Sequence, residues 1–223
     1  VVLIYLAKHY TETAVNRMLV AVIMPFASCQ PYIEKSADVM PQEMFIGRKN
    51  ELEKIESATG VNIVYGGRQL GKTALLRMAK KDIDMDENGD RAVIVNAWRK
   101  DYRDTARAIS AALYDEGILK TENITEDWDE LARDIKNRLR DQEDPIPYLL
   151  LMIDEADEFI ESCELIGYQP FDALKDIQSV GNGRFKFVVA GLRNIVRFKR
   201  AATLGNNSVL THLDSLTVKP VRS

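Results

Sequence analysis

The stretch GGRQLGKT at residues 66–73 decides the fold of this 223-residue chain, because it fits the pattern G-x-x-x-x-G-K-[ST]. Glycines let a backbone curl so that successive N–H groups point inward at phosphate oxygens. A helix that follows directs its positive end at the same anion. Lys72 is expected to reach the β- and γ-phosphates of a nucleotide, and the Thr73 hydroxyl to bind magnesium.

The sequence around this stretch has the context that the pattern requires. The apolar run Val61–Tyr65 suits a buried strand, and Thr73–Lys81 has helical spacing. A strand before and a helix after make a merely glycine-rich turn the weaker interpretation. Contacts to the nucleotide are predicted from Gly66, Gly67, Arg68, Gln69, Leu70, Gly71, Lys72, Thr73 and Ala74.

A second motif is LLLMIDE at residues 149–155, an apolar run that ends in two acidic residues. The tip of such a strand emerges at the carboxyl edge of a parallel sheet, beside the phosphate loop. Asp154 is predicted to hold magnesium through water, and Glu155 to act as general base on the attacking water. The alternative is a solvated helix cap. Asp157 and Glu158 are interpreted as charged surface without a role.

A third candidate site is the end of the apolar run Phe185–Ala190, which continues as Gly-Leu-Arg-Asn. A cationic or polar side chain at this strand tip can distinguish a triphosphate from a diphosphate. Arg193 is the preferred candidate for this role, and also for catalysis, with Asn194 second. The alternative is a solvated arginine followed by an asparagine that starts a helix.

The remaining chain predicts alternating strands and helices, hence a parallel sheet covered on both faces. Strands are expected at Val61–Tyr65, Ala92–Trp98, Tyr148–Ile153, Phe185–Ala190 and Leu216–Val221, and helices at Lys49–Ser57, Thr73–Lys81, Asp104–Asp115, Trp128–Arg140, Phe171–Val180 and Ile195–Ala202. Residues 1–40 are expected to form a helical appendage and linker, and residues 41–223 a nucleotide-binding domain.

The composition of the chain limits the classes of function that are expected. With 34 acidic and 30 basic residues the net charge is −4, so nucleic-acid binding has no electrostatic footprint. The two N-terminal apolar runs are shorter than the ~20 residues that a membrane span needs. Cys29 and Cys163 lack metal-ligand spacing and are expected to be free thiols in the cytoplasm, or simply buried apolar residues. Because the first residue is Val, the chain is expected to be a fragment of a longer protein.

The segment FIGRKNEL at residues 45–52 resembles a signature of STAND-type signalling ATPases, hydrophobic-hydrophobic-Gly-Arg-Glu-x-Glu. Archaeal-type ATPases and the origin-recognition ATPases of the AAA+ class have a similar segment. The stretches GGRQLGKTALL at 66–76, IDEAD at 153–157 and FKFVVAGLRNIVRF at 185–198 look like the same group. The resemblance covers roughly residues 43–221.

This resemblance implies an ASCE-type P-loop NTPase with sheet order 5-1-4-3-2. It implies that Gly47 and Arg48 lie near the nucleotide and report its state, and that Arg193 matches an arginine ending the fourth strand. Lys49 stands where the family usually has Glu. The chain stops soon after the fifth predicted strand, so the lid domain is expected to be absent or very small.

Three functions follow from these observations. The first is a slow ATPase that uses ATP and magnesium as a regulatory switch of the STAND type, with protein partners or self-association through regions outside this chain. The second is an AAA+ ATPase acting on DNA, for which basic residues gather at Arg193, Arg197, Lys199 and Arg200, although such a run is also typical of a solvated helix face. The third is a nucleotide-binding scaffold with negligible hydrolysis. Adenine is favoured because the guanine-reading segment of GTPases is absent.

Overall fold

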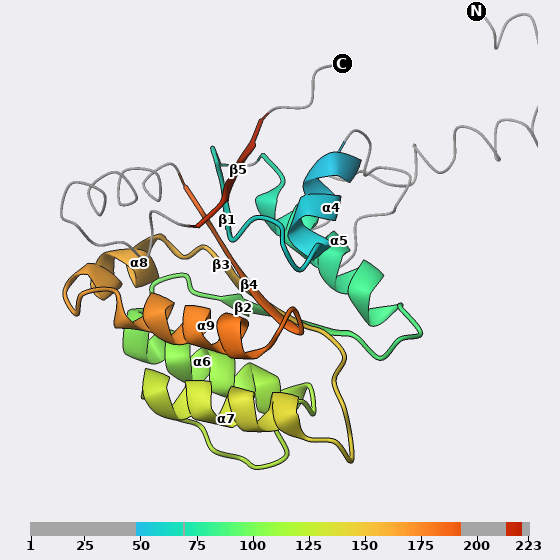
Figure 1. Cartoon of the computed structure of the whole chain (residues 1–223). Coiled ribbons are helices and arrows are strands. Elements are labelled where there is room, and N and C mark those ends of the chain that lie inside the picture. The colour runs from blue at the N-terminus through green and yellow to red at the C-terminus, as the bar shows by residue number, and fades with distance from the viewer. Residues whose placement is uncertain (1–47, 69, 193–212, 220–223) are drawn as a thin grey trace, which may run out of the picture. The chain divides into compact units, whose positions relative to one another are not determined.

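A five-stranded sheet forms the centre of the protein (Figure 1). The computed structural model describes residues 48–68, 70–192 and 213–219, all of which belong to the compact unit Gln42–Ser223. The strands lie in the order β2-β3-β4-β1-β5, and each pairing is parallel. Their bounds are β1 Ile63–Gly66, β2 Arg91–Asn96, β3 Leu149–Asp154, β4 Phe185–Gly191 and β5 Ser215–Val218. This confirms the expected α/β fold and the order 5-1-4-3-2.

Burial along the strands follows their position in the sheet. All six residues of β3 and all seven of β4 are buried, as the unbroken apolar runs predict for inner strands covered on both faces. At one edge of the sheet, only Val218 of β5 is buried. Within β4 the exception to apolar patterning is Lys186, a charged residue that is fully buried.

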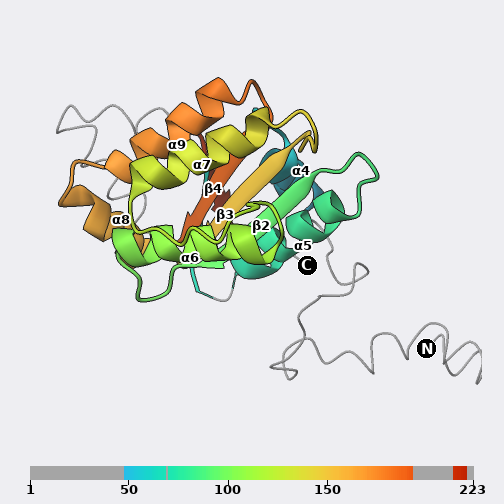
Figure 2. The ribbon, with the colours of Figure 1, turned by 90° about the horizontal axis from the view of Figure 1, so that it is seen from below.

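Helices cover both faces of the sheet, as Figure 2 shows from below. Alternate side chains of β4 point to opposite faces, so that Val188 joins one core cluster and Phe187 the other. The first cluster includes residues of α4 Lys49–Glu56 and α5 Lys72–Asp84. The second includes residues of α6 Tyr102–Asp115, α7 Trp128–Arg140, α8 Asp157–Glu164 and α9 Gln169–Val180.

Aromatic side chains fill the larger core cluster. Phe159 of α8 stacks on Trp128 with ring centroids 5.6 Å apart, and on Phe171 with centroids 5.5 Å apart. Cys163 is buried in the same cluster, and burial raises the pKa of its thiol. This thiol therefore packs as a small apolar residue, one of the two interpretations of the sequence. Cys29 lies outside the described residues.

The structure differs from the predicted elements mainly at α8. The sequence predicts charged surface after residue 156, whereas Asp157–Glu164 is a helix. Its acidic first turn is stabilised by the helix dipole, and its buried residues are Phe159, Ile160 and Cys163. β5 ends at Val218 rather than at Val221. The helix predicted at 195–202 and the helical segment and boundary predicted at 1–40 lie outside the described residues.

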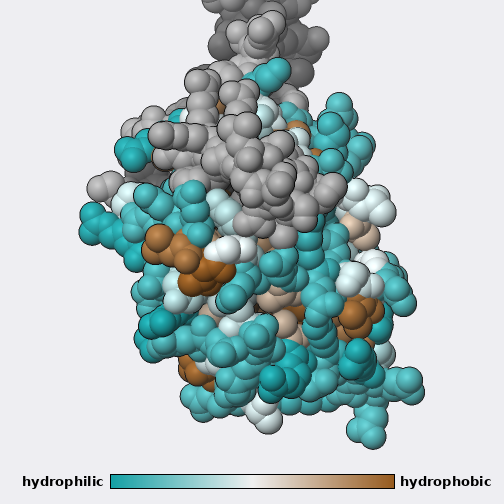
Figure 3. All heavy atoms as spheres, turned by 60° about the vertical axis from the view of Figure 1, so that its left-hand side comes forward, coloured by the Kyte–Doolittle hydropathy of each residue, from teal (hydrophilic) through white to brown (hydrophobic). Residues whose placement is uncertain are grey.

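The described surface is mainly hydrophilic in the view of Figure 3, where hydrophobic side chains form separate patches. Large hydrophobic residues that are exposed include Leu165, Met85 and Trp98. Within the described ranges, none of the helices has the length and apolar character needed to cross a membrane.

Candidate functional site

The phosphate loop, residues 66–73, connects the end of β1 to the start of α5. Gly66 is the last residue of β1, and a Cβ atom there would lie 2.6 Å from the carbonyl oxygen of Val218 in β5. The neighbouring strand therefore requires glycine at this position. Gly71 has φ 80° and ψ 25°, a left-handed conformation that favours glycine, and it is the N-cap residue of α5. Only the second of these glycines is explained by the curling of the loop.

Lys72 is the first residue of α5, and its side chain folds back into the phosphate loop. It is 6% exposed, and its Nζ donates hydrogen bonds to the carbonyl oxygens of Gly66 at 3.2 Å and Gly67 at 2.9 Å. The first-turn N–H groups of a helix have no acceptor within that helix and carry partial positive charge. The loop thus places an ammonium group beside a helix N-terminus, an arrangement that favours a polyphosphate.

Asp154 lies at the carboxyl end of β3 and is 2% exposed. Its Oδ2 accepts a 2.6 Å hydrogen bond from the Thr73 hydroxyl, and its Oδ1 accepts a 2.9 Å bond from the Glu155 backbone N–H. Both carboxylate oxygens are therefore oriented. The structure brings the predicted metal residues of the two motifs together at one edge of the sheet.

Glu155 follows with φ 54°, a left-handed conformation that is uncommon for a non-glycine residue. The next residue anchors this turn, because the Ala156 N–H donates to the Ala190 carbonyl oxygen at 2.9 Å. A residue in this conformation costs about 1 kcal/mol or more and persists where the surroundings fix it. The backbone therefore fixes Glu155 at the end of β3, beside Asp154.

Asp157, which the sequence leaves without a role, holds the tip of β4. Its two carboxylate oxygens accept the Leu192 backbone N–H at 3.1 and 2.9 Å. Leu192 immediately precedes Arg193, the predicted sensor. The missed signal was an acidic residue in the first turn after the β3 motif, three residues beyond Asp154.

Arg48 is the N-cap residue of α4, and its side chain contacts the phosphate loop. It is 8% exposed, and its Nη2 donates to the carbonyl oxygens of Leu70 at 2.8 Å and Lys219 at 3.1 Å. Its Nη1 is buried and has no hydrogen-bond partner among the described residues. The guanidinium thus joins the loop to the residue that follows β5.

Not all predicted contacts are placed. Arg68 is exposed, while Leu70 and Ala74 are half-buried beside the residues described above. The predicted site residues Gly47, Gln69 and Arg193 lie outside the described residues, as do Asn194 and the basic residues Arg197, Lys199 and Arg200.

The donor set fits magnesium. A hydroxyl oxygen of Thr73 and a carboxylate oxygen of Asp154 are hard ligands, already in contact at 2.6 Å. Magnesium is usually held by one or two protein oxygens, with phosphates and water completing its octahedral shell. Among the described residues, no group of three or more His, Cys, Asp or Glu side chains is arranged to hold a metal ion. The site therefore matches a metal that arrives with a nucleotide, rather than one held by a protein cage.

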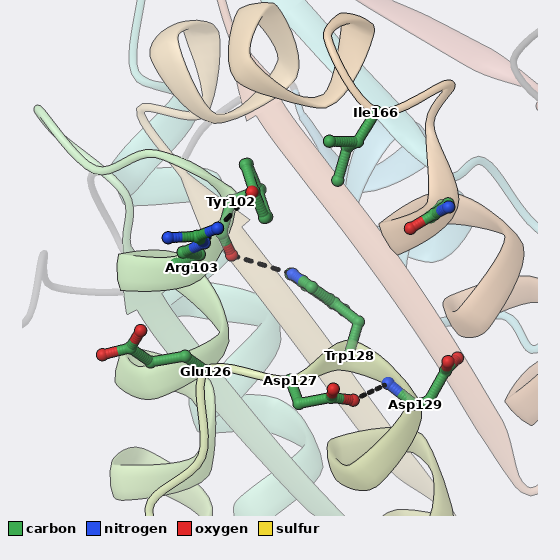
Figure 4. A pocket seen from close by; sticks show the side chains of 8 residues that line it. Tyr102, Arg103, Glu126, Asp127, Trp128, Asp129 and Ile166 are labelled. Atoms are coloured by element: carbon green, nitrogen blue, oxygen red, sulfur yellow. Dashed lines mark hydrogen bonds between the residues drawn. The ribbon is translucent and has the colours of Figure 1, made fainter.

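A separate cavity of about 330 Å³ lies where the first turns of α6 and α7 meet the α8–α9 connection (Figure 4). It is lined by Tyr102, Arg103, Glu126, Asp127, Trp128, Asp129, Ile166 and Gln169. Several of these polar groups already have structural partners. The Trp128 Nε1–H donates to the Tyr102 carbonyl oxygen at 2.8 Å, and Asp127 caps α7. No phosphate-loop residue lines this cavity, so the candidate site is the loop and not the cavity.

Two solved structures share this fold. The ORC2 protein of Aeropyrum pernix, in ADPNP–ADP complexes, has a TM-score of 0.53 and 16% identity, over 77% of this chain and 47% of that one. A Walker-type ATPase of Pyrococcus abyssi has a TM-score of 0.55 and 14% identity, over 83% of this chain and 57% of that one. The chain therefore spans about half the length of these proteins. A search of curated proteins found no match.

The family is established by the sequence itself. The family described as "AAA domain" matches residues 55–197, which is more than half of the chain. The matched range contains the phosphate loop, the tip of β3 and the tip of β4, the three places where the sequence predicts chemistry. The chain therefore belongs to the AAA domain family.

Proposed function

We propose that this chain binds ATP with magnesium, hydrolyses it slowly, and serves as a regulatory switch of the STAND type. The observation that carries this proposal is the 2.6 Å contact between the Thr73 hydroxyl and Asp154 Oδ2. It joins the phosphate loop to the acidic tip of β3, two parts that are needed together for phosphoryl transfer to water. Membership of the AAA domain family supports the same reaction.

The residues divide the reaction between binding and proton transfer. Lys72 exchanges its bonds to the loop carbonyls for bonds to the β- and γ-phosphates, and the loop N–H groups bind the remaining oxygens. Thr73 and Asp154 would hold magnesium, which would neutralise charge on the phosphates. Glu155 accepts a proton from the attacking water, whose oxygen bonds to the γ-phosphorus. The bond to the β–γ bridging oxygen breaks, and ADP and phosphate leave.

The switch would lie in the strand tips that surround the γ-phosphate. Arg193, which follows the β4 tip held by Asp157, is proposed to contact the γ-phosphate and to lose that contact after cleavage. Segments ordered by a γ-phosphate relax when it leaves, so slow hydrolysis sets the lifetime of the active state. Partners or self-association through regions outside this chain would transmit that change.

The proposal is tested by ATP affinity and phosphate release in three variants. Lys72→Ala is expected to abolish ATP binding, and Glu155→Gln to keep binding but lose turnover. Glu158→Gln, an exposed neighbour, is the matched control and should leave both unchanged. Unaltered ATP affinity in Lys72→Ala would overturn the assignment of the loop. Binding without turnover in the wild type would instead favour a nucleotide-binding scaffold.

Action on DNA is a second candidate, favoured by one exposed segment, residues 98–103. The Arg99 guanidinium lies 5.6 Å from the Trp98 ring centroid, and that of Arg103 lies 5.5 Å from the Tyr102 ring. Trp98 is 52% exposed. Nucleic-acid bases stack on such aromatic side chains, while arginines attract the backbone.

This candidate predicts binding to a labelled single strand that weakens as salt rises and is reduced in Trp98→Ala. The net charge of −4 opposes it. No binding at low salt would exclude it.

A further inference from the structure

Lys186 is a fully buried lysine in β4. Its ammonium group binds backbone carbonyl oxygens at the C-terminal end of α4. Its Nζ donates to three carbonyl oxygens, those of Lys54 at 2.9 Å, Ile55 at 2.7 Å and Ser57 at 2.6 Å. An ammonium has three donors, so all of them are satisfied. Burial lowers its pKa to about 8, and the nearby Glu56 carboxylate opposes that shift. The group therefore remains largely charged at neutral pH.

These acceptors belong to the last turn of α4 and the residue that follows it. The final carbonyls of a helix lack partners within the helix and carry partial negative charge, which a buried cation stabilises. The Tyr148 hydroxyl donates to the neighbouring carbonyl oxygen of Glu56 at 3.0 Å. A Cβ at Gly60 would lie 1.9 Å from the Lys54 carbonyl oxygen and 2.9 Å from the Lys186 Nζ. Lys186 of β4 and Tyr148, the residue before β3, thus fix this end of α4.

The other end of the same helix reaches the candidate site. Arg48, the N-cap residue of α4, donates to the Leu70 carbonyl oxygen of the phosphate loop at 2.8 Å. An eight-residue helix is about 12 Å long, and its backbone hydrogen bonds link one turn to the next. α4 lies alongside α5, the helix that follows the phosphate loop (Figure 1). Fixing one end of α4 therefore fixes where Arg48 meets the loop.

We propose that Lys186 is a positioning residue for nucleotide binding, because it holds α4 and thereby holds Arg48 against the phosphate loop. This inference rests on the proposed function. A loop that already has its bound conformation loses less conformational entropy when it takes up phosphate. Loss of the Lys186 ammonium would release the end of α4, loosen the Arg48–Leu70 bond and weaken nucleotide binding without touching the nucleotide.

A double-mutant cycle in the full chain tests this coupling with a fluorescent ATP analogue. Lys186→Met and Arg48→Met are each expected to weaken binding about fivefold to tenfold. Because both act through one contact, the double variant should be within about twofold of Arg48→Met alone. Independent losses that multiply would overturn the proposal. Leu139→Ala, in the core on the opposite face, is the control that lowers the melting temperature but leaves affinity unchanged.

If Lys186→Met does not fold, Tyr148→Phe replaces it in the cycle. This variant removes one hydrogen bond from the same end of α4, so binding should weaken about twofold to threefold, and only when Arg48 is present. An unchanged affinity in Tyr148→Phe would then reject the coupling. The proposed function fails separately, if the wild type binds no nucleotide or Lys72→Ala keeps full affinity.

Discussion

The Thr73 hydroxyl donates a 2.6 Å hydrogen bond to Oδ2 of Asp154, a residue 81 positions later in the sequence. The contact exists because β1 and β3 flank β4 in the sheet, so their carboxyl ends meet at one edge. Parallel α/β sheets bind ligands at this edge, where strand tips and helix N-termini converge. Two side chains from separate motifs thus meet where the proposed function places a metal and a polyphosphate.

The first prediction concerns this pair. Thr73→Val removes the hydroxyl but keeps the branched shape, so magnesium should no longer increase ATP affinity. Thr73→Ser keeps the hydroxyl and should behave like the wild type. ATP titrations with magnesium and with EDTA distinguish these outcomes: the affinities of the three proteins should agree in EDTA, and with magnesium Thr73→Val should bind about tenfold more weakly than the other two. A magnesium effect that survives in Thr73→Val would contradict the assignment.

The second prediction concerns Gly66 and stability. In Gly66→Ala the new methyl group would lie 2.6 Å from the Val218 carbonyl oxygen and force β1 and β5 apart. Overpacking of this kind costs about 1–3 kcal/mol in free energy of unfolding, measured by urea denaturation. Gly67→Ala is the matched control, since among the residues that the structure describes its Cβ would meet the movable side chain of Leu70, at 3.4 Å. Equal stability of the two variants would count against strand packing as the reason for glycine at 66.

The third prediction concerns pH. The pKa of Glu56 is raised to about 7 by burial and by the charges of Asp82 and Glu53, with partial relief from Lys186. An acid with a raised pKa binds its proton more tightly in the folded state, so its contribution to stability is present below about pH 4.5. That contribution is lost as pH rises through about 7.

Glu56→Gln removes this titration. Its melting temperature relative to the wild type should therefore rise between pH 5 and pH 8. A difference in melting temperature that stays constant across this range would show that Glu56 titrates normally.

The fourth prediction concerns Asp157, which holds the Leu192 backbone N–H. Asp157→Ala should reduce turnover about threefold to tenfold and leave ATP affinity nearly unchanged, because Arg193, the next residue after Leu192, is proposed to act in the reaction more than in binding. Steady-state phosphate release and equilibrium titration measure the two effects. Asp157→Asn retains an acceptor and should recover part of the rate. If Asp157→Ala turns over ATP as fast as the wild type, Asp157 has no role in the reaction.

The sequence by itself determined the type of sheet and which residues stand at each strand tip. The phosphate-loop pattern is local, since a backbone turn, an ammonium and a hydroxyl occupy neighbouring positions, so its role is predicted without the tertiary structure. Unbroken apolar runs indicated inner parallel strands, and β3 and β4 are entirely buried. Helix α8 was missed because its acidic first residues, Asp157 and Glu158, were interpreted as charged surface.

Only the tertiary structure decided which distant groups meet. The Thr73–Asp154 contact, the Arg48–Leu70 bond and the three bonds of Lys186 join residues from 22 to 132 positions apart. The apolar run around Lys186 predicts a buried strand, but nothing local to it shows which groups receive the charge of this lysine. Its burial becomes favourable only when the folded structure packs the end of α4 against it and supplies three carbonyl oxygens. A buried charge is stable only when its hydrogen-bond partners are in place.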